Sequence, residues 1–129
     1  MMKKQRFLKQ CKDKFFDCYK ELDGKKIVLF PAGGRAHMMM LAFRELNIGA
    51  DIQAVLDNNC KYDTDIEKIP VYSSERIRDY LDCIFVVCSD TYRSAISQQI
   101  VEQGGTVFDI PEWEGLAEQM LTLHEYKTK

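Results

Sequence analysis

The residues best suited to chemistry form a short glycine turn at residues 31–36, which read PAGGRA. An apolar run, IVLF, comes just before the turn, and no helix breaker follows it until Asn47, so a strand, a turn and a helix are predicted. The first N–H groups of such a helix have no internal partner and attract anions, above all phosphate. Compared with G-x-G-x-x-G, Gly33 keeps the middle glycine, while Pro31 and Ala36 replace the outer two. The turn is expected to bind a phosphate group or, alternatively, only to connect two core elements.

Polar residues after two other predicted strands could complete a nucleotide site. Asp57 lies 23 positions after Gly34, close to the roughly 20-residue separation at which an acid can accept hydrogen bonds from a ribose. Aspartate and asparagine are also common turn residues, so Asp57 and Asn58 have a purely structural alternative. Ser89 follows the buried run DCIFVVC. Because parallel strands end at one edge of a sheet, Gly33, Asp57 and Ser89 should meet there.

No catalytic group accompanies these residues, which favours a binding protein over an enzyme. His37 could polarise a bound group, but a lone histidine at the start of a helix is more often a packing residue. Cys60 would be reactive only if a nearby cation lowered its pKa. The five cysteines include no C-x-x-C pair, which is typical of reduced thiols in an intracellular protein and makes structural zinc improbable. We therefore predict no catalytic residue and no metal ligand.

The elements that must position these residues alternate along the chain. Strands are predicted at residues 27–30, 51–56, 69–72, 82–88 and 106–110, with helices at residues 35–46, 74–81 and 89–101 and from Pro111 onward. This alternation predicts an α/β fold, a doubly wound, Rossmann-like parallel sheet with strand order 3-2-1-4-5. Pro70 confines the third strand to an edge of the sheet. Residues 61–68 show no periodicity and are predicted to be irregular.

A leading helix at residues 2–22 is amphipathic. Its apolar positions step by three or four residues and are Leu8, Cys11, Phe15, Cys18 and Leu22. The opposite face is mainly basic. Three uses of the apolar stripe are open: packing on its own domain, forming a homodimer seam or docking to a separate enzyme, and attachment to a membrane surface. We expect residues 1–24 to form this helix and residues 25–129 to form the Rossmann-like domain.

Composition narrows the classes of partner. The 129 residues suit one domain, with 46% hydrophobic and 29% charged residues and a formal net charge of -2. Such a balance gives no sign of a nucleic-acid partner. No apolar run approaches the roughly 20 residues that span a bilayer, and the first residues lack the apolar core of a signal peptide. A cytoplasmic location is therefore predicted.

Four segments, taken as a set, resemble a known module. They are IVLFPAGGRA, AVLDNN, KIPVYSSERI and CIFVVCSDTYRSAISQQIVEQGG, within residues 25–110. The set resembles a Rossmann-like module found at the front of bacterial sugar acyltransferases and beside methyltransferases and glycosyltransferases of surface-glycan synthesis. The resemblance implies nucleotide-sugar binding. It places Ala32, Gly33, Gly34 and Arg35 against phosphate, Asp57 and Asn58 against the nucleoside or sugar, and Ser89 and Tyr92 in the wall of the crevice.

These observations favour a module that binds a nucleotide or nucleotide-sugar, with a UDP-sugar or NAD(P) as the ligand. Such a module would be accessory to surface-glycan or sugar biosynthesis and would have no catalytic centre of its own. An alternative is an NAD(P)-dependent oxidoreductase, in which Asp57 would favour NAD because an acid repels a 2′-phosphate. A further alternative is a protein-interaction module whose nucleotide site is vestigial.

Overall fold

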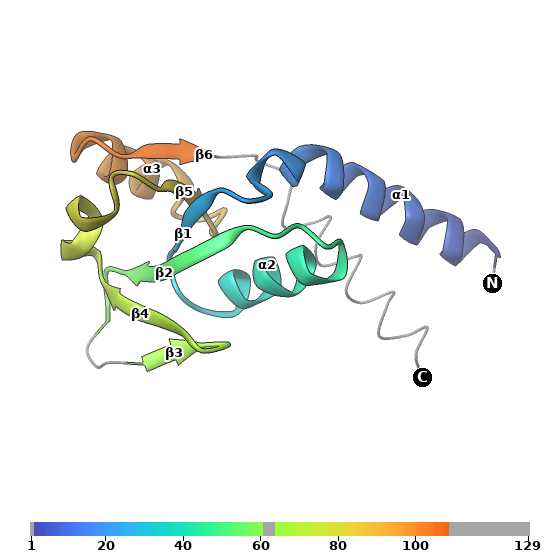
Figure 1. The fold of residues 1–129 in the computed structure, drawn as a ribbon, viewed down its shortest axis with the longest axis horizontal. Helices are drawn as coiled ribbons and strands as arrows, with labels where there is room; N and C mark the ends of the chain where they lie inside the picture. The colour runs from blue at the N-terminus through green and yellow to red at the C-terminus, as the bar shows by residue number, and fades with distance from the viewer. Residues whose placement is uncertain (1, 61–63, 109–129) are drawn as a thin grey trace.

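Strands and helices alternate along most of the chain, as predicted (Figure 1). The computed structural model describes residues 2–60 and 64–108. The helices are α1 (Met2–Tyr19), α2 (Gly34–Glu45) and α3 (Arg93–Glu102), with the short 3₁₀ helices η1 (Lys20–Leu22) and η2 (Ser74–Tyr80). The strands are β1 (Lys26–Phe30), β2 (Asp51–Asp57), β3 (Thr64–Ile66), β4 (Ile69–Ser73), β5 (Ile84–Val87) and β6 (Thr106–Phe108).

The strands form one sheet in the order β3-β4-β2-β1-β5-β6. Strands β4, β2, β1, β5 and β6 are parallel, and β3 runs antiparallel to β4. Counted over the five predicted strands, this order is 3-2-1-4-5, so the predicted topology is confirmed. The chain winds from β1 toward β2 and later returns to β5 on the other side of β1. The winding therefore reverses between β1 and β5, the place where open α/β sheets bind ligands beyond the carboxyl ends of their strands.

Strand β3 was not predicted, and it corrects the edge position assigned to β4. Residues 64–66 pair with β4, with Asp65 opposite Pro70. The pairing of β4 with β2 begins one residue later, where Val71 lies opposite Val55. Pro70 therefore lies outside the ladder between β2 and β4, which explains how a strand with a proline has a neighbour on each side.

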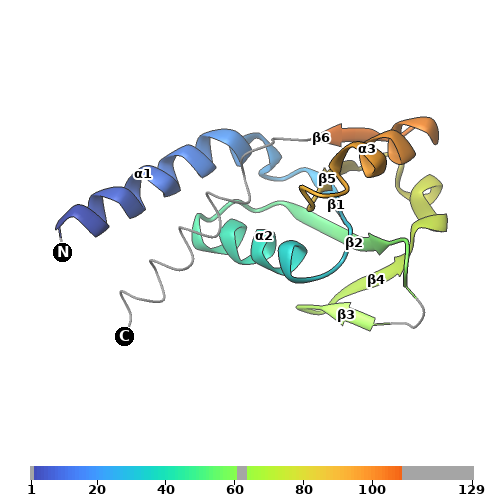
Figure 2. The same ribbon diagram turned by 180° about the vertical axis from the view of Figure 1, so that it is seen from behind.

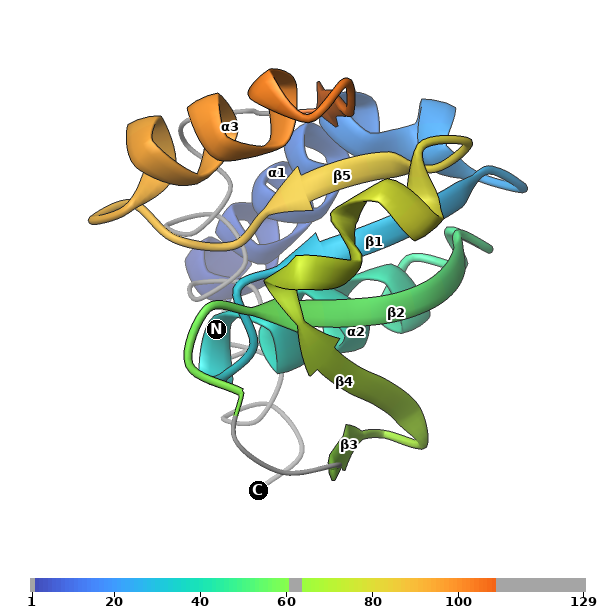
Figure 3. The ribbon, with the colours of Figure 1, turned by 90° about the vertical axis from the view of Figure 1, so that its left-hand side faces the viewer.

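Helices cover both faces of the sheet. Alternate residues of β1 point to opposite faces, so Ile27 and Leu29 join the hydrophobic core with α1 and α2, while Val28 and Phe30 join the core with η2 and α3. All four side chains are fully buried, as expected for a central parallel strand. Figure 3 shows η2 in front of the sheet and α2 behind it. Figure 2 shows α1 and α2 together from the reverse side.

The leading helix packs on its own chain. In the predicted stripe Leu8, Cys11, Phe15 and Leu22 are buried and Cys18 is half-buried. The ring of Phe15 lies 6.2 Å from that of Phe43 in α2, and the ring of Tyr19 lies 5.5 Å from that of Phe108 in β6. The prediction that the stripe forms a dimer seam or a docking face is therefore corrected, because α2 and the sheet of the same chain already cover these side chains.

Several predicted boundaries change. The helix predicted at residues 74–81 is the 3₁₀ helix η2, capped by Ser73, whose Oγ accepts a hydrogen bond from the N–H of Glu75 at 3.2 Å. The helix predicted to open at Ser89 begins at Arg93. The predicted helix from Pro111 lies outside the described residues, as does the end of the strand predicted at 106–110. Within residues 2–60 and 64–108, no helix is long and apolar enough to cross a bilayer.

Candidate functional site

The glycine turn lies at the carboxyl end of β1 and opens directly into α2. Gly33 has φ 128°, a conformation that favours glycine, and forms the N-cap of the helix without a side-chain hydrogen bond. The first helical hydrogen bond runs from the N–H of His37 to the carbonyl of Gly33 at 3.1 Å. A Cβ atom built on Gly33 or Gly34 would meet nothing within 4 Å. The start of α2 is therefore open above the turn, and its first N–H groups can meet an anion there.

Asp57 connects this turn to the end of β2. Its Oδ2 accepts a hydrogen bond from the N–H of Ala32 at 3.0 Å, and its Oδ1 accepts one from the N–H of Asn59 at 2.7 Å. These contacts agree with the structural alternative given above, in which Asp57 shapes the turn. A carboxylate offers about four acceptor positions. Two backbone bonds therefore leave capacity for the hydroxyl groups of a ribose.

Asn58 is held by a residue that the sequence did not single out. Its Nδ2 donates to Oε1 of Gln99 at 3.1 Å, and Nε2 of Gln99 donates back to its Oδ1 at 2.8 Å. Gln99 belongs to α3, so the pair ties the turn after β2 to the helix after β5. Asn58 was predicted to face the nucleoside or sugar, but its side-chain amide is engaged with Gln99.

Residues after β5 reach the same edge through the backbone. The N–H of Cys88 donates to the carbonyl of Phe30 at 2.7 Å, which continues the β1–β5 pairing to the end of both strands. Ser89 Oγ accepts a hydrogen bond from the N–H of Tyr92 at 3.1 Å, so it shapes the turn that leads into α3. The side chain of Tyr92 is 64% exposed. Arg35, in the first turn of α2, is exposed as well.

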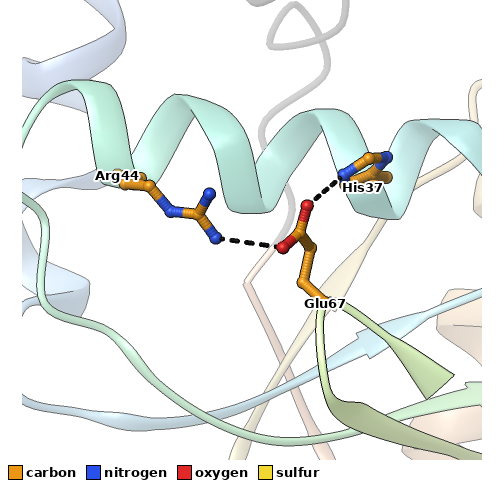
Figure 4. Close-up of polar contacts among 3 residues, drawn as sticks. All are labelled: His37, Arg44 and Glu67. Carbon is orange, nitrogen blue, oxygen red and sulfur yellow. Dashed lines mark hydrogen bonds and ion pairs between the residues drawn. The ribbon is translucent and has the colours of Figure 1, made fainter.

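The hairpin between β3 and β4 contacts α2 through Glu67 (Figure 4). One Glu67 oxygen lies 2.8 Å from Nε2 of His37, and the other lies 3.5 Å from a guanidinium nitrogen of Arg44. The hydrogen bond with His37, followed by the positive charge of Arg44, lowers the pKa of the Glu67 carboxyl. His37 thus connects the helix that begins at the glycine turn to the β3–β4 hairpin. Local sequence carries no signal for this contact, because Glu67 lies in a stretch predicted to be irregular.

Two buried thiols have raised pKa values. Burial, and then the charge of Asp82, raises the pKa of Cys83 to about 11, and burial also raises the pKa of Cys11. Both groups therefore stay protonated near neutral pH. Cys60 is half-buried, with its Sγ 3.7 Å from the carbonyl oxygen of Val71. In the described part of the chain, no group of three or more histidine, cysteine, aspartate or glutamate residues could hold a metal ion.

The arrangement at the strand ends suits binding of a ligand that carries both an anionic group and hydroxyl groups. The opening of α2 supplies backbone donors, and Asp57, half-buried, supplies an acceptor one strand away. The structure brings Asp57 into contact with the glycine turn. It holds Asn58 on α3, and it gives Ser89 a local hydrogen bond with the N–H of Tyr92.

Comparison with known proteins identifies the fold class. The chain has a Rossmann-like α/β fold, and a solved structure described as "RSP, a Rex-family repressor" superimposes on it with a TM-score of 0.56. The match covers 81% of this chain and 61% of the repressor chain, at 12% sequence identity. At this identity the likeness concerns the fold alone. No protein-family description and no curated protein sequence matches this chain.

Proposed function

We propose that this chain binds a nucleotide at the carboxyl edge of its sheet. The observation that carries the proposal is the open start of α2 next to Asp57, at the point where the winding of the sheet reverses. A helix N-terminus favours a phosphate group, and an acid at the end of the neighbouring strand favours a ribose. The two groups are parts of one ligand in a nucleotide.

The contacts of the turn define how the ligand would lie. Pro31 has no N–H, and the N–H of Ala32 is bonded to Asp57, so the phosphate would rely on the backbone from Gly33 onward. Asp57 would then receive ribose hydroxyls on its remaining acceptor positions. Its negative charge disfavours a 2′-phosphate, so NAD is preferred over NADP.

The finer proposal is a nucleotide-sugar ligand and an accessory role in surface-glycan or sugar biosynthesis. It rests on the resemblance of the four sequence segments to the modules of sugar acyltransferases. We propose a binding role without catalysis because the hydrogen bonds that the structure shows for Asp57 come from backbone N–H groups, and His37 points to Glu67 on the β3–β4 hairpin. The cytoplasmic location and the lack of a nucleic-acid partner stay predictions from composition.

The test is a titration of the intact chain with UDP-sugars, NAD, NADP and adenosine nucleotides, followed by thermal shift and calorimetry. One ligand class should stabilise the fold, by about 2.7 kcal/mol when its concentration is 100 times Kd. Gly33→Ala should weaken binding, because φ 128° is strained for alanine and the turn must move. Gly24→Ala is the matched control: its φ is 75°, it also has open space around it, and it lies before β1.

Gly24→Ala should lose roughly 1–2 kcal/mol of stability and Gly33→Ala at least as much, because the φ and ψ of Gly33 lie in a region that is essentially restricted to glycine. Only Gly33→Ala should lose affinity. If Gly33→Ala does not fold, the ligand titration is made with Gly34→Ala in its place. The Cβ of this variant enters open space and its φ lies outside the strained region, so the variant should fold. The proposal fails if no ligand shifts the melting temperature at millimolar concentration. Hydride transfer from a sugar to bound NAD, with formation of NADH, would instead support the alternative of an NAD(P)-dependent oxidoreductase. If no nucleotide binds, the protein-interaction module remains as the alternative function.

A further inference from the structure

A pair of side-chain amides joins two elements that lie on opposite sides of β1. Asn58 follows β2, and Gln99 belongs to α3, the helix after β5. In the sheet, β1 lies between β2 and β5 (Figure 3). The two amides exchange two hydrogen bonds, at 3.1 and 2.8 Å, over a separation of 41 positions in the chain. The pair therefore connects the two sides of the point where the winding of the sheet reverses.

The fold holds the two partners of this pair with different firmness. Gln99 is half-buried, and Ile96 and Ile100 on either side of it are buried in the core between α3 and the sheet. Asn58 is exposed and lies in the turn after β2. The packed helix thus gives this turn a partner whose position is fixed by the core.

The same turn carries the ribose acceptor of the proposed site. Asp57 Oδ1 accepts a hydrogen bond from the N–H of Asn59 at 2.7 Å, so the carboxylate is oriented by the turn itself. This bond fixes the shape of the turn and leaves its direction relative to the sheet free. A turn that moves would carry the carboxylate away from the place where it can meet a ribose.

Contacts with neighbouring elements limit the direction of the turn. On the β1 side, the N–H of Ala32 donates to Asp57 Oδ2 at 3.0 Å. On the β4 side, the Sγ of Cys60 lies 3.7 Å from the carbonyl oxygen of Val71, a weak contact because a thiol is a weak donor. The amide pair adds the contact with α3, and its two hydrogen bonds restrict rotation as well as distance.

We propose that Gln99 is a positioning residue of the nucleotide site: by holding Asn58, it keeps Asp57 where the carboxylate receives the ribose hydroxyls. This inference rests on the proposed nucleotide function. Gln99 acts through the turn and makes no contact with the ligand. Neutral amides that meet at the surface add little to stability, because water satisfies each of them when they separate. The pair should therefore matter more for affinity than for folding.

The test measures Kd by calorimetry with the intact chain and three probes. They are ADP or UDP, whichever binds, its 2′,3′-dideoxy analogue, and inorganic pyrophosphate. In Gln99→Ala the Kd of the nucleoside diphosphate should rise by about three- to tenfold, the factor that corresponds to one net hydrogen bond. The dideoxy analogue and pyrophosphate lack the ribose hydroxyls, so each should bind Gln99→Ala and the wild type equally.

Gln98→Ala is the matched control. Gln98 lies beside Gln99 on α3, and its Nε2 donates to Oε1 of Glu102 at 2.9 Å, so the variant removes an amide hydrogen bond within the helix. It should leave all three Kd values unchanged. Asn58→Ala removes the same pair from its other side, and the double variant should bind no more weakly than Asn58→Ala. Far-UV circular dichroism establishes folding, and Asn58→Ala replaces Gln99→Ala if the latter does not fold.

Three results overturn this inference and leave the proposed function intact. The first is a nucleotide Kd that is the same in Gln99→Ala as in Gln98→Ala. The second is an equal loss of affinity for all three probes, which would give the pair a purely structural role. The third is a pair of single-variant losses that add in the double variant. If the wild type binds neither ADP nor UDP, the inference also fails, and the titration with whole nucleotides shows whether the proposed function fails with it.

Discussion

Replacing Phe15 with alanine tests whether α1 belongs to the cooperative core. The Phe15 side chain is fully buried, with its ring 4.7 Å from that of Tyr19 and 6.2 Å from that of Phe43. Removing a buried phenylalanine ring costs about 3–5 kcal/mol, the lost burial plus the cavity that remains. The contacts with two aromatic neighbours favour the upper part of this range. Such a loss is a large share of the roughly 5–15 kcal/mol that stabilises a typical domain.

Urea unfolding followed by far-UV circular dichroism measures the effect, with Phe7→Ala as the control. Phe7 lies on the same helix but is 44% exposed, so its truncation should cost about 1 kcal/mol or less. The free energy of unfolding should therefore fall at least about 2 kcal/mol further for Phe15→Ala than for Phe7→Ala.

Two results would refute the packing of α1 on its own sheet. The first is equal loss of stability in the two variants. The second is a wild-type dimer that Phe15→Ala converts into a folded monomer, because the side chain would then be buried between two copies. Size-exclusion chromatography with light scattering distinguishes this second result from ordinary destabilisation.

Two further predictions concern carboxylates. The contacts of Glu67 lower its pKa in the folded state below the ordinary value of 4.5. Glu67 therefore stabilises the fold above pH 4.5 and loses this contribution as the pH falls through the lowered pKa. Urea unfolding of the wild type and Glu67→Gln should therefore differ at pH 7 and converge in acid, and a difference that grows in acid would contradict the assignment. Asp57→Ala should lower the free energy of unfolding by about 1–2 kcal/mol without any ligand, because two backbone N–H groups lose a charged acceptor. Unchanged stability of this variant in the same assay would mean that Asp57 serves a ligand alone.

Local pattern was sufficient for the main architecture. The apolar run before the glycine turn predicted a strand buried on both faces, and β1 has this character, with Ile27 to Phe30 all buried. Helical steps of three and four predicted α1 and the face that it buries. The strand order followed from alternation and from the right-handed crossover, which leaves few topologies for a chain of this kind.

The candidate site was predictable in its position and less so in its contacts. The glycine turn and Asp57 could be placed at one edge because parallel strands end together. That Asp57 bonds to Ala32 could not be read from the sequence, because the two residues are 25 positions apart and each has other possible partners. Asn58 illustrates the same limit, since its partner Gln99 is 41 positions away on α3.

The sequence by itself determined which residues are apolar, which segments form the main helices and strands, and where the backbone can turn, because these depend on neighbours along the chain. The tertiary structure decided which polar side chains pair, since a pair forms only after two distant elements have docked. Glu67 shows the reason most clearly: its neighbour in the chain is Lys68, yet the β3–β4 hairpin brings its carboxylate within 2.8 Å of His37, 30 positions away. Polar contacts of this kind follow from the packing of the core, and the core follows from the apolar pattern.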